Sequence, residues 1–96
     1  MRNKANVVAW AAAKGILDNS TAFKQSLKTL EELTELMTAL NNNDEAEIRD
    51  AYGDILVTLI IGAELANVDL EQCLEEAYNV IAKRTGKMVD GLFVKD

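Results

Sequence analysis

Apolar residues recur at intervals of three and four along one stretch of about twenty residues, a pattern that only an α-helix turns into a single face. They are Phe23, Leu27, Leu30, Leu33, Met37 and Leu40. We call this set the leucine stripe. Ser20 or Thr21 stands before it as a suitable N-cap. The pattern predicts a helix of about twenty residues whose leucine stripe packs, while its opposite side presents polar groups.

The rest of the chain also favours helices over sheet. It contains no proline and only five glycines among 96 residues, which suits long helices joined by short connections. A first, alanine-rich helix is expected from about Lys4 to Lys14 with Gly15 at its exit, followed by a turn through Asp18 and Asn19. No linker, repeat or low-complexity segment divides the chain, so residues 1–96 are expected to form one domain.

Two further helices are expected after Asn41–Asn43 break the periodic pattern. Asp44 with a glutamate three positions later resembles a capping box, and Asp69 with a glutamine at the same spacing repeats the signal before a helix that ends at Gly86. Residues 87–96 contain apolar side chains that could pack on a neighbour, but they show no clear period.

The run Ile55–Ala63 is apolar on nearly every side of its helix. A lone surface helix in so small a domain would not tolerate this, so we expect it to be buried between subunits. A short chain also buries only a modest share of its surface when it folds alone. The expected fold is therefore all-α, a four-helix bundle completed by homo-oligomerisation.

Charge and cysteine content limit the choice of partners. Residues 29–82 hold thirteen acids against one base, whereas the two ends hold nine bases against three acids. Such an acidic centre disfavours a nucleic acid polymer and favours a divalent metal. The single Cys73, the absence of a leader pattern and the shortness of the apolar run predict a cytoplasmic protein that does not enter a membrane.

One polar stripe on the second predicted helix could carry chemistry. It contains Gln25, Lys28, Glu32 and Glu35 at spacings of three, four and three, with Glu31 on its flank. Glutamates at i and i+3 lie about 5–6 Å apart at the Cβ level and can share a hard cation. Taken alone, such a pair usually belongs to a solvated face.

Asp50 and Asp54 on the third predicted helix strengthen the metal hypothesis. Asp54 directly precedes the apolar run, where water is scarce. Two like charges about 5.5 Å apart repel by about 3 kcal/mol at an effective dielectric constant of 20, so four facing carboxylates need cations. Without histidine the set suits Mg²⁺, with Mn²⁺ as a possible substitute. The alternative is that Asp54 is a buried acid paired with Lys28 or another base.

Residues near the carboxyl end of the fourth predicted helix could bind phosphate. Asn79 and Lys83 stand at i and i+4, and Arg84 follows. Basic residues are also common at helix ends for reasons of stability alone. Trp10 could stack on a nucleotide base, although an aromatic residue at helical spacing is more often part of a core.

At this point the sequence resembles a known family. The segment Glu31-Glu32-Leu33-Thr34-Glu35 is similar to the EExxE signature of the MazG-like pyrophosphohydrolases, part of an all-α group that includes the dimeric dUTPases. The similarity extends over most of the chain. Its other segments are Gln25-Ser-Leu-Lys28, Gly53-Asp54-Ile-Leu56, Asn79-Val-Ile-Ala-Lys83-Arg84 and Gly86-Lys87-Met88.

The resemblance implies a helical homodimer or homotetramer that hydrolyses a nucleoside triphosphate to monophosphate and pyrophosphate. It implies Glu32, Glu35 and Asp54 as metal ligands, with Glu31 as a further ligand or the group that orients the attacking water. It also implies that a set of polar residues faces the nucleotide. They are Gln25, Lys28, Asn79 and Lys83.

One position departs from the family pattern. The second signature is ExxD, and Ala51 stands where its glutamate is expected. Asp50, one residue earlier, could serve as a displaced ligand, since i,i+4 neighbours lie almost as close on a helix as i,i+3 neighbours.

Our hypothesis from the sequence is Mg²⁺-dependent hydrolysis of a nucleoside triphosphate, with a deoxynucleotide preferred and Glu31 and Glu35 as the catalytic carboxylates. Arg84 and Lys83 would neutralise charge on the phosphates, and Trp10 would contact the base. Removal of damaged nucleotides and control of a normal pool are both open as roles. Two alternatives are a non-catalytic nucleotide-binding or sensing module of the same fold, disabled at Ala51, and a structural helical bundle.

Overall fold

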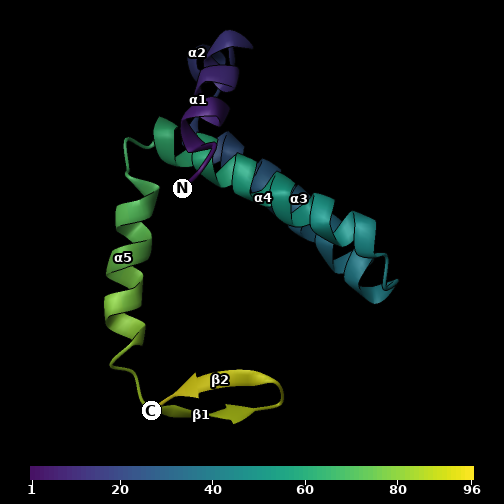
Figure 1. Ribbon diagram of the computed structural model, residues 1–96, viewed down its shortest axis with the longest axis vertical. Coiled ribbons are helices and arrows are strands. Elements are labelled where there is room, and N and C mark those ends of the chain that lie inside the picture. The colour runs from purple at the N-terminus through teal and green to yellow at the C-terminus, as the bar shows by residue number, and fades with distance from the viewer.

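A computed structural model describes residues 1–96 as five helices followed by a two-stranded hairpin (Figure 1). The elements are α1 (Lys4–Ala13), α2 (Ile16–Asn19), α3 (Ala22–Asn41), α4 (Glu45–Leu65), α5 (Leu70–Ile81), β1 (Gly86–Val89) and β2 (Leu92–Lys95). The predicted all-α class is confirmed. The short α2 occupies the stretch that the sequence predicted to be a turn.

The three long helices begin at the capping residues that the sequence indicated. The Thr21 hydroxyl accepts a hydrogen bond from the Lys24 backbone N–H at 3.1 Å, and the Asp44 carboxylate accepts one from the Glu47 N–H at 3.2 Å. Asp69 accepts from two N–H groups in the first turn of α5. Each cap satisfies backbone donors that have no partner within the helix, which sets where the helix starts.

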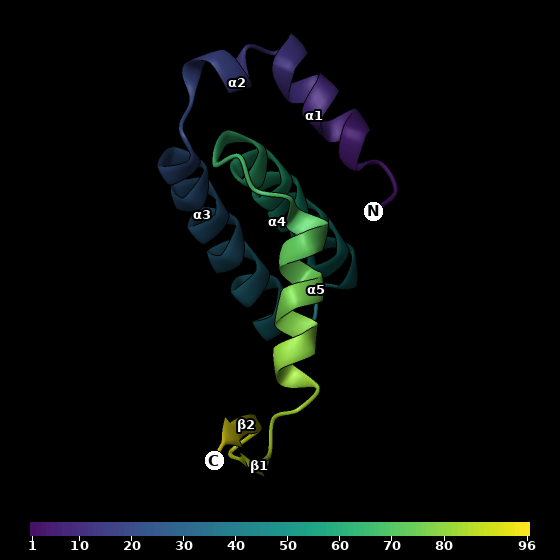
Figure 2. The ribbon, with the colours of Figure 1, turned by 90° about the vertical axis from the view of Figure 1, so that its left-hand side faces the viewer.

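α3 and α4 form the centre of the molecule. They run antiparallel and side by side, and α1 and α2 lie across the end where α3 begins and α4 finishes (Figures 1 and 2). The buried residues are few and lie on α1, α3 and α4. They are Ala11, Glu32, Leu36, Ala39, Ala51, Thr58, Ile60 and Ile61.

The leucine stripe does not pack within the chain, which corrects the prediction from the sequence. The side of α3 that faces α4 carries the buried residues of this helix, which are Glu32, Leu36 and Ala39. Small side chains at this contact, such as Ala39 and Ala51, let the two helices approach closely. The stripe on the outer side of α3 remains open, and Leu30 is 61% exposed.

α5 ends earlier than predicted. It stops at Ile81 rather than near Gly86, and residues 86–95 form an antiparallel hairpin where no regular structure was predicted. The turn is Asp90-Gly91, and both residues have positive φ angles, of 50° and 82°. An Asp-Gly pair between apolar residues is a strong hairpin signal because both positions tolerate the left-handed region.

α5 and the hairpin stand away from the α3–α4 pair, so a single chain does not close a four-helix bundle (Figure 1). No single helix has the length and apolar character needed to cross a membrane. α4 and α5 reach that apolar length only together, as a pair bent by 104°.

Candidate functional site

A pocket of about 440 Å³ opens where α1, α2, α3 and α4 meet. Its lining combines acidic, basic, amide and apolar side chains. They are Trp10, Ile16, Lys24, Gln25, Lys28, Glu32, Asp54, Val57, Thr58 and Ile61. Five of these residues were predicted from the sequence to be site residues. α3 supplies both bases and one carboxylate, and α4 supplies the facing carboxylate.

Glu32 is the most unusual residue of the pocket because it is a buried carboxylate, with 7% of the residue exposed. Its Oε1 lies 3.6 Å from Lys28 Nζ, but its Oε2 is buried without a hydrogen-bond partner. Burial raises the pKa of Glu32 above its usual value, and the neighbouring Glu35 raises it further. One oxygen of this carboxylate, Oε2, therefore has no partner within the chain.

Asp54 faces Glu32 from α4. Partial burial raises the pKa of Asp54, and repulsion from Asp50 and then from Glu32 adds to this increase. Attraction by Lys28 acts in the opposite sense but is smaller. The two helices thus bring Asp50 and Glu32 close enough to Asp54 to repel its carboxylate.

Glu31 and Glu35 lie at the border of the pocket. Lys28 Nζ donates to Glu31 Oε1 at 3.3 Å, and this contact raises the pKa of Lys28. Glu35 lies next to Glu32 and lines a separate polar hollow of about 380 Å³ between α3 and the start of α4. Of the two predicted catalytic carboxylates, Glu35 is free of an ion pair and Glu31 is bound to Lys28.

A pair of threonines joins the two helices next to the carboxylates. The Thr29 hydroxyl donates to the Thr58 hydroxyl at 2.7 Å, and Thr58 donates to the Ile55 carbonyl at 2.8 Å. Thr58 is buried. Because both hydroxyls have partners, these polar groups sit between the helices without an unsatisfied donor, and they fix the register of α3 against α4.

The residues of the site fit a divalent cation. No three acidic or cysteine side chains converge into a ready-made metal cluster. Glu32 nevertheless has a buried oxygen without a partner, and burial, followed by repulsion from neighbouring carboxylates, raises the pKa values of Glu32 and Asp54. A hard cation is the partner that such oxygen donors prefer. Asp50 and Glu35 flank the facing pair and complete a set of four candidate ligands.

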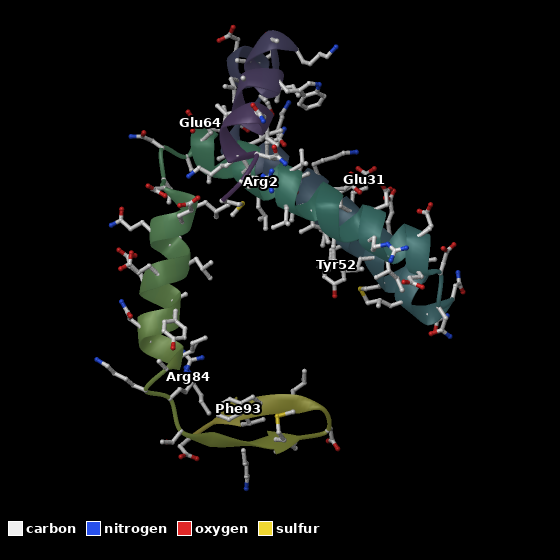
Figure 3. The ribbon with its side chains drawn as sticks, viewed as in Figure 1. Arg2, Glu31, Tyr52, Glu64, Arg84 and Phe93 are labelled. Atoms are coloured by element: carbon white, nitrogen blue, oxygen red, sulfur yellow. The ribbon has the colours of Figure 1, made fainter.

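Three predicted substrate-binding residues lie elsewhere. Asn79, Lys83 and Arg84 belong to α5 and the segment after it. Arg84 lies beside the hairpin, whereas Glu31 lies on the side of the α3–α4 pair that faces away from α5 (Figure 3). The structure does not bring these three into the pocket of their own chain.

Lys24 lines the pocket, although it was not among the site residues predicted from the sequence. The sequence could have indicated Lys24, because it stands four residues before Lys28 and both ammonium groups therefore lie on the same side of α3.

The sequence profile of one protein family matches residues 9–79, about three quarters of the chain, and that family is described as phosphoribosyl-ATP pyrophosphohydrolase. The chain belongs to this family. The match includes every residue that lines the pocket. Lys83, Arg84 and the hairpin lie beyond it.

One relative is an uncharacterized 18.2 kDa protein from the rep–hol intergenic region of Haemophilus phage HP1. It is 33% identical over 64 residues, which cover 67% of this chain and 39% of the phage protein. The chain therefore spans about two fifths of the length of that relative. No solved structure matches the chain significantly.

The buried Glu32 and the half-buried Asp54 of this family member predict an unusual dependence of stability on pH. In metal-free protein the pKa values of Glu32 and Asp54 lie above the ordinary 4.5 and 3.8. Their protonated forms therefore favour the fold, and their contribution is fully present below about pH 4. It is lost as pH rises through the raised pKa values. We expect the free energy of unfolding in urea to fall over this range by more in wild type than in Glu32→Gln.

The comparison of wild type with Glu32→Gln isolates the contribution of Glu32 to the pH dependence of stability. Asp69 and Glu71 have lowered pKa values, due first to a backbone hydrogen bond from Gln72 and to the N-terminal ammonium, respectively. Their lowered pKa values make the fold more stable as pH rises, but by the same amount in wild type and in Glu32→Gln. Parallel pH profiles of the two proteins would contradict the assignment.

Proposed function

We propose that the protein is a Mg²⁺-dependent pyrophosphohydrolase of the MazG-like kind, which converts a nucleoside triphosphate to the monophosphate and pyrophosphate. The observation that carries the proposal is the pocket in which the buried, half-unpartnered Glu32 faces Asp54 beside Lys24 and Lys28. Facing carboxylates suit a cation, and adjacent ammonium groups suit phosphate oxygens. Family membership supports the same class of reaction.

Glu32, Glu35, Asp50 and Asp54 would hold the metal. When bound, Mg²⁺ supplies charge neutralisation on the phosphates and a bound water of lowered pKa. Lys24 and Lys28 bind phosphate oxygens, and Gln25 donates or accepts a hydrogen bond at the same edge of the pocket. Glu35, with Glu31 as the second candidate, orients the water that attacks phosphorus.

The nucleoside part of the substrate would lie on the apolar side of the pocket. Trp10 is about half exposed and offers a ring on which a base can stack. Ile16, Val57 and Ile61 line the same cavity. A deoxynucleoside triphosphate is the substrate that we propose first. The family description names phosphoribosyl-ATP. This compound carries the same triphosphate group, so the assay includes it for comparison.

The test is pyrophosphate release from canonical and modified dNTPs and NTPs and from phosphoribosyl-ATP, in Mg²⁺, in Mn²⁺ and in EDTA. We expect release with Mg²⁺, weaker or equal release with Mn²⁺, and none with EDTA.

Lys24→Ala should raise KM for the triphosphate, because it removes a phosphate contact. Lys14→Ala is a matched control, since Lys14 is an exposed lysine outside the pocket. Metal-independent release, or release of inorganic phosphate alone, would contradict the proposal.

A nucleotide-binding module without catalysis is the second candidate, and Ala51 favours it. Ala51 is buried against α3 at the position of the missing family glutamate. The cation site is therefore one carboxylate short unless Asp50 replaces it. A rise in melting temperature with nucleotide and Mg²⁺, without turnover of any substrate, would establish this candidate instead.

A further inference from the structure

A second cavity adjoins the pocket on the side of α1. Its volume is about 490 Å³, and its lining residues are Asn3, Asn6, Val7, Trp10, Asp54 and Val57. Three of them, Trp10, Asp54 and Val57, also line the pocket that holds the candidate metal ligands. The two cavities are therefore continuous around Trp10, and a ligand larger than a triphosphate group can extend from one into the other. We call the second cavity the α1 cavity.

The α1 cavity differs chemically from the pocket beside it. The pocket contains the ammonium groups of Lys24 and Lys28, whereas no basic side chain lines the α1 cavity. Its only charged group is the Asp54 carboxylate, which repels phosphate. The other lining groups are two amides and apolar or aromatic side chains, which suit the flat, neutral ring of a nucleobase. The phosphates of a nucleotide thus belong in the pocket, and its base belongs in the α1 cavity.

One side of α1 forms the wall of this cavity. The wall residues recur at spacings of three, one and three, which place them along the same side of a helix. They are Asn3, Asn6, Val7 and Trp10. The neighbouring side of α1 holds the helix in place, since Ala11 is fully buried and Lys4 Nζ lies 3.7 Å from Asp69 Oδ1. The wall is therefore a fixed surface on a helix and not a loop that adapts to each ligand.

The two asparagines of the wall are joined to each other. Asn6 Nδ2 donates a hydrogen bond to Asn3 Oδ1 at 3.1 Å. Asn3 is the N-cap residue of α1, but its side chain makes no capping hydrogen bond. Its φ angle of 66° lies in the left-handed region, which asparagine tolerates better than most residues. An N-cap asparagine normally uses its oxygen to cap the helix, so in this chain that oxygen is free to orient Asn6.

This contact decides which atoms Asn6 presents to the α1 cavity. One amide proton of Asn6 is used by Asn3, so the carbonyl oxygen Oδ1 lies on the far side of the planar amide and accepts no hydrogen bond within the chain. Trp10 follows one turn further along the same side of α1. A base stacked on Trp10 therefore meets an acceptor at Asn6, with an amide N–H beside it. The matching edge is an exocyclic amino group next to a ring nitrogen.

We propose that the α1 cavity binds the nucleobase of the substrate, and that Asn6, oriented by Asn3, selects adenine and cytosine over the corresponding keto bases hypoxanthine and uracil. Asn6 accepts a hydrogen bond from the exocyclic amino group, which the keto bases lack. Asn3 is a positioning residue, because it acts only through Asn6. The sugar lies between, against the apolar side of the pocket. This inference rests on the proposed function for the identity of the ligand as a nucleotide, but binding of the base does not require turnover.

The fluorescence of Trp10 tests the base site directly, because Trp10 is the only tryptophan in the chain. The ligands are the α,β-imido analogues of dATP, dITP, dCTP and dUTP, which resist cleavage between the α and β phosphates, and each is titrated in Mg²⁺. We expect saturable quenching, with dissociation constants about five- to a hundredfold lower for the adenine and cytosine analogues than for their keto partners. Absence of quenching, or equal dissociation constants within each amino–keto pair, would overturn the proposal.

Variants of the two asparagines test the role of each. Asn6→Ala should bring the dissociation constants within each pair to within about twofold of each other, and α1 should remain helical because alanine is the stronger helix former. Asn3→Gly keeps the positive φ angle but removes the accepting oxygen, so it should narrow the ratio as well. Asn3→Asp keeps an accepting oxygen and should restore the ratio.

Asn41→Ala is the matched control, since Asn41 is exposed and lines neither cavity. It should leave both dissociation constants and their ratio as in wild type. An unchanged ratio in Asn6→Ala would overturn the selection by Asn6. Equal ratios in Asn3→Asp and Asn3→Gly would overturn the positioning role of Asn3.

Steady-state assays with the cleavable triphosphates distinguish this inference from the proposed function. We expect kcat/KM for pyrophosphate release to be higher for dATP and dCTP than for dITP and dUTP, and Asn6→Ala to remove this preference. Release at equal kcat/KM from all four would sustain the proposed function and overturn the selection of the base. Selective quenching of Trp10 without pyrophosphate release would overturn the proposed activity and sustain the α1 cavity as the base site.

Discussion

Glu32→Gln is expected to reduce Mg²⁺-dependent pyrophosphate release by a factor on the order of 10²–10³, without loss of the fold. The substitution keeps the volume of the side chain but removes the negative charge that faces Asp54. The oxygen that has no partner belongs to this carboxylate, so metal affinity and turnover should decrease together. Steady-state assays over a range of Mg²⁺ concentrations measure both.

The same variant separates catalysis from stability. In metal-free protein at neutral pH it should unfold at an equal or higher urea concentration than wild type, because it removes a buried and incompletely paired charge, a penalty of about 1 kcal/mol. Glu75→Gln is the control, since Glu75 is exposed on α5 and makes no ion pair. Full activity in Glu32→Gln would remove Glu32 from the metal site. A large loss of stability would show instead that Glu32 stabilises α3 through its i,i+4 ion pair with Lys28.

Ile61→Ala is expected to lower the free energy of unfolding by about 2–4 kcal/mol. Ile61 is 3% exposed and lies between α4 and the elements that pack on it, where it also forms part of the pocket wall. Its truncation loses buried apolar surface and leaves a cavity in a core of only a few residues. Urea denaturation followed by circular dichroism measures the change.

A smaller truncation at the same position makes the stability test specific. Ile61→Val removes one methylene and should lower the free energy of unfolding by about 0.5–1.5 kcal/mol. If Ile61→Ala had no larger effect than Ile61→Val, the core of the protomer would not be centred on the contact between α3 and α4. The stability of the protein would then come from contacts between chains.

The helices and their starting points were readable from the sequence because the responsible interactions are local. Thr21, Asp44 and Asp69 each accept hydrogen bonds from residues two or three positions further along the chain. The hairpin could also have been predicted, since the Asp90-Gly91 pair between apolar residues is a local signal of the same kind. The apolar residues of this tail follow no helical period, so periodicity alone predicts no element there.

The sequence indicated five of the residues that line the pocket, but not how the outer faces pack. Glu32 and Asp54 were selected because a helix places carboxylates at these spacings on one side, and the structure brings them together. Lys24 was missed although the same periodicity includes it. The leucine stripe was expected to face the core, yet the side of α3 with Glu32, Leu36 and Ala39 does so.

The sequence by itself therefore determined the helix boundaries at the caps, the all-α class and the chemical character of the carboxylate set, because each depends on groups only a few residues apart. The tertiary structure alone decided which side of α3 packs, that Glu32 Oε2 is buried without a partner, and that Asn79, Lys83 and Arg84 lie away from the pocket of their own chain. Periodicity assigns residues to the sides of a helix, but which side is buried depends on the surfaces that another element or another chain presents to it.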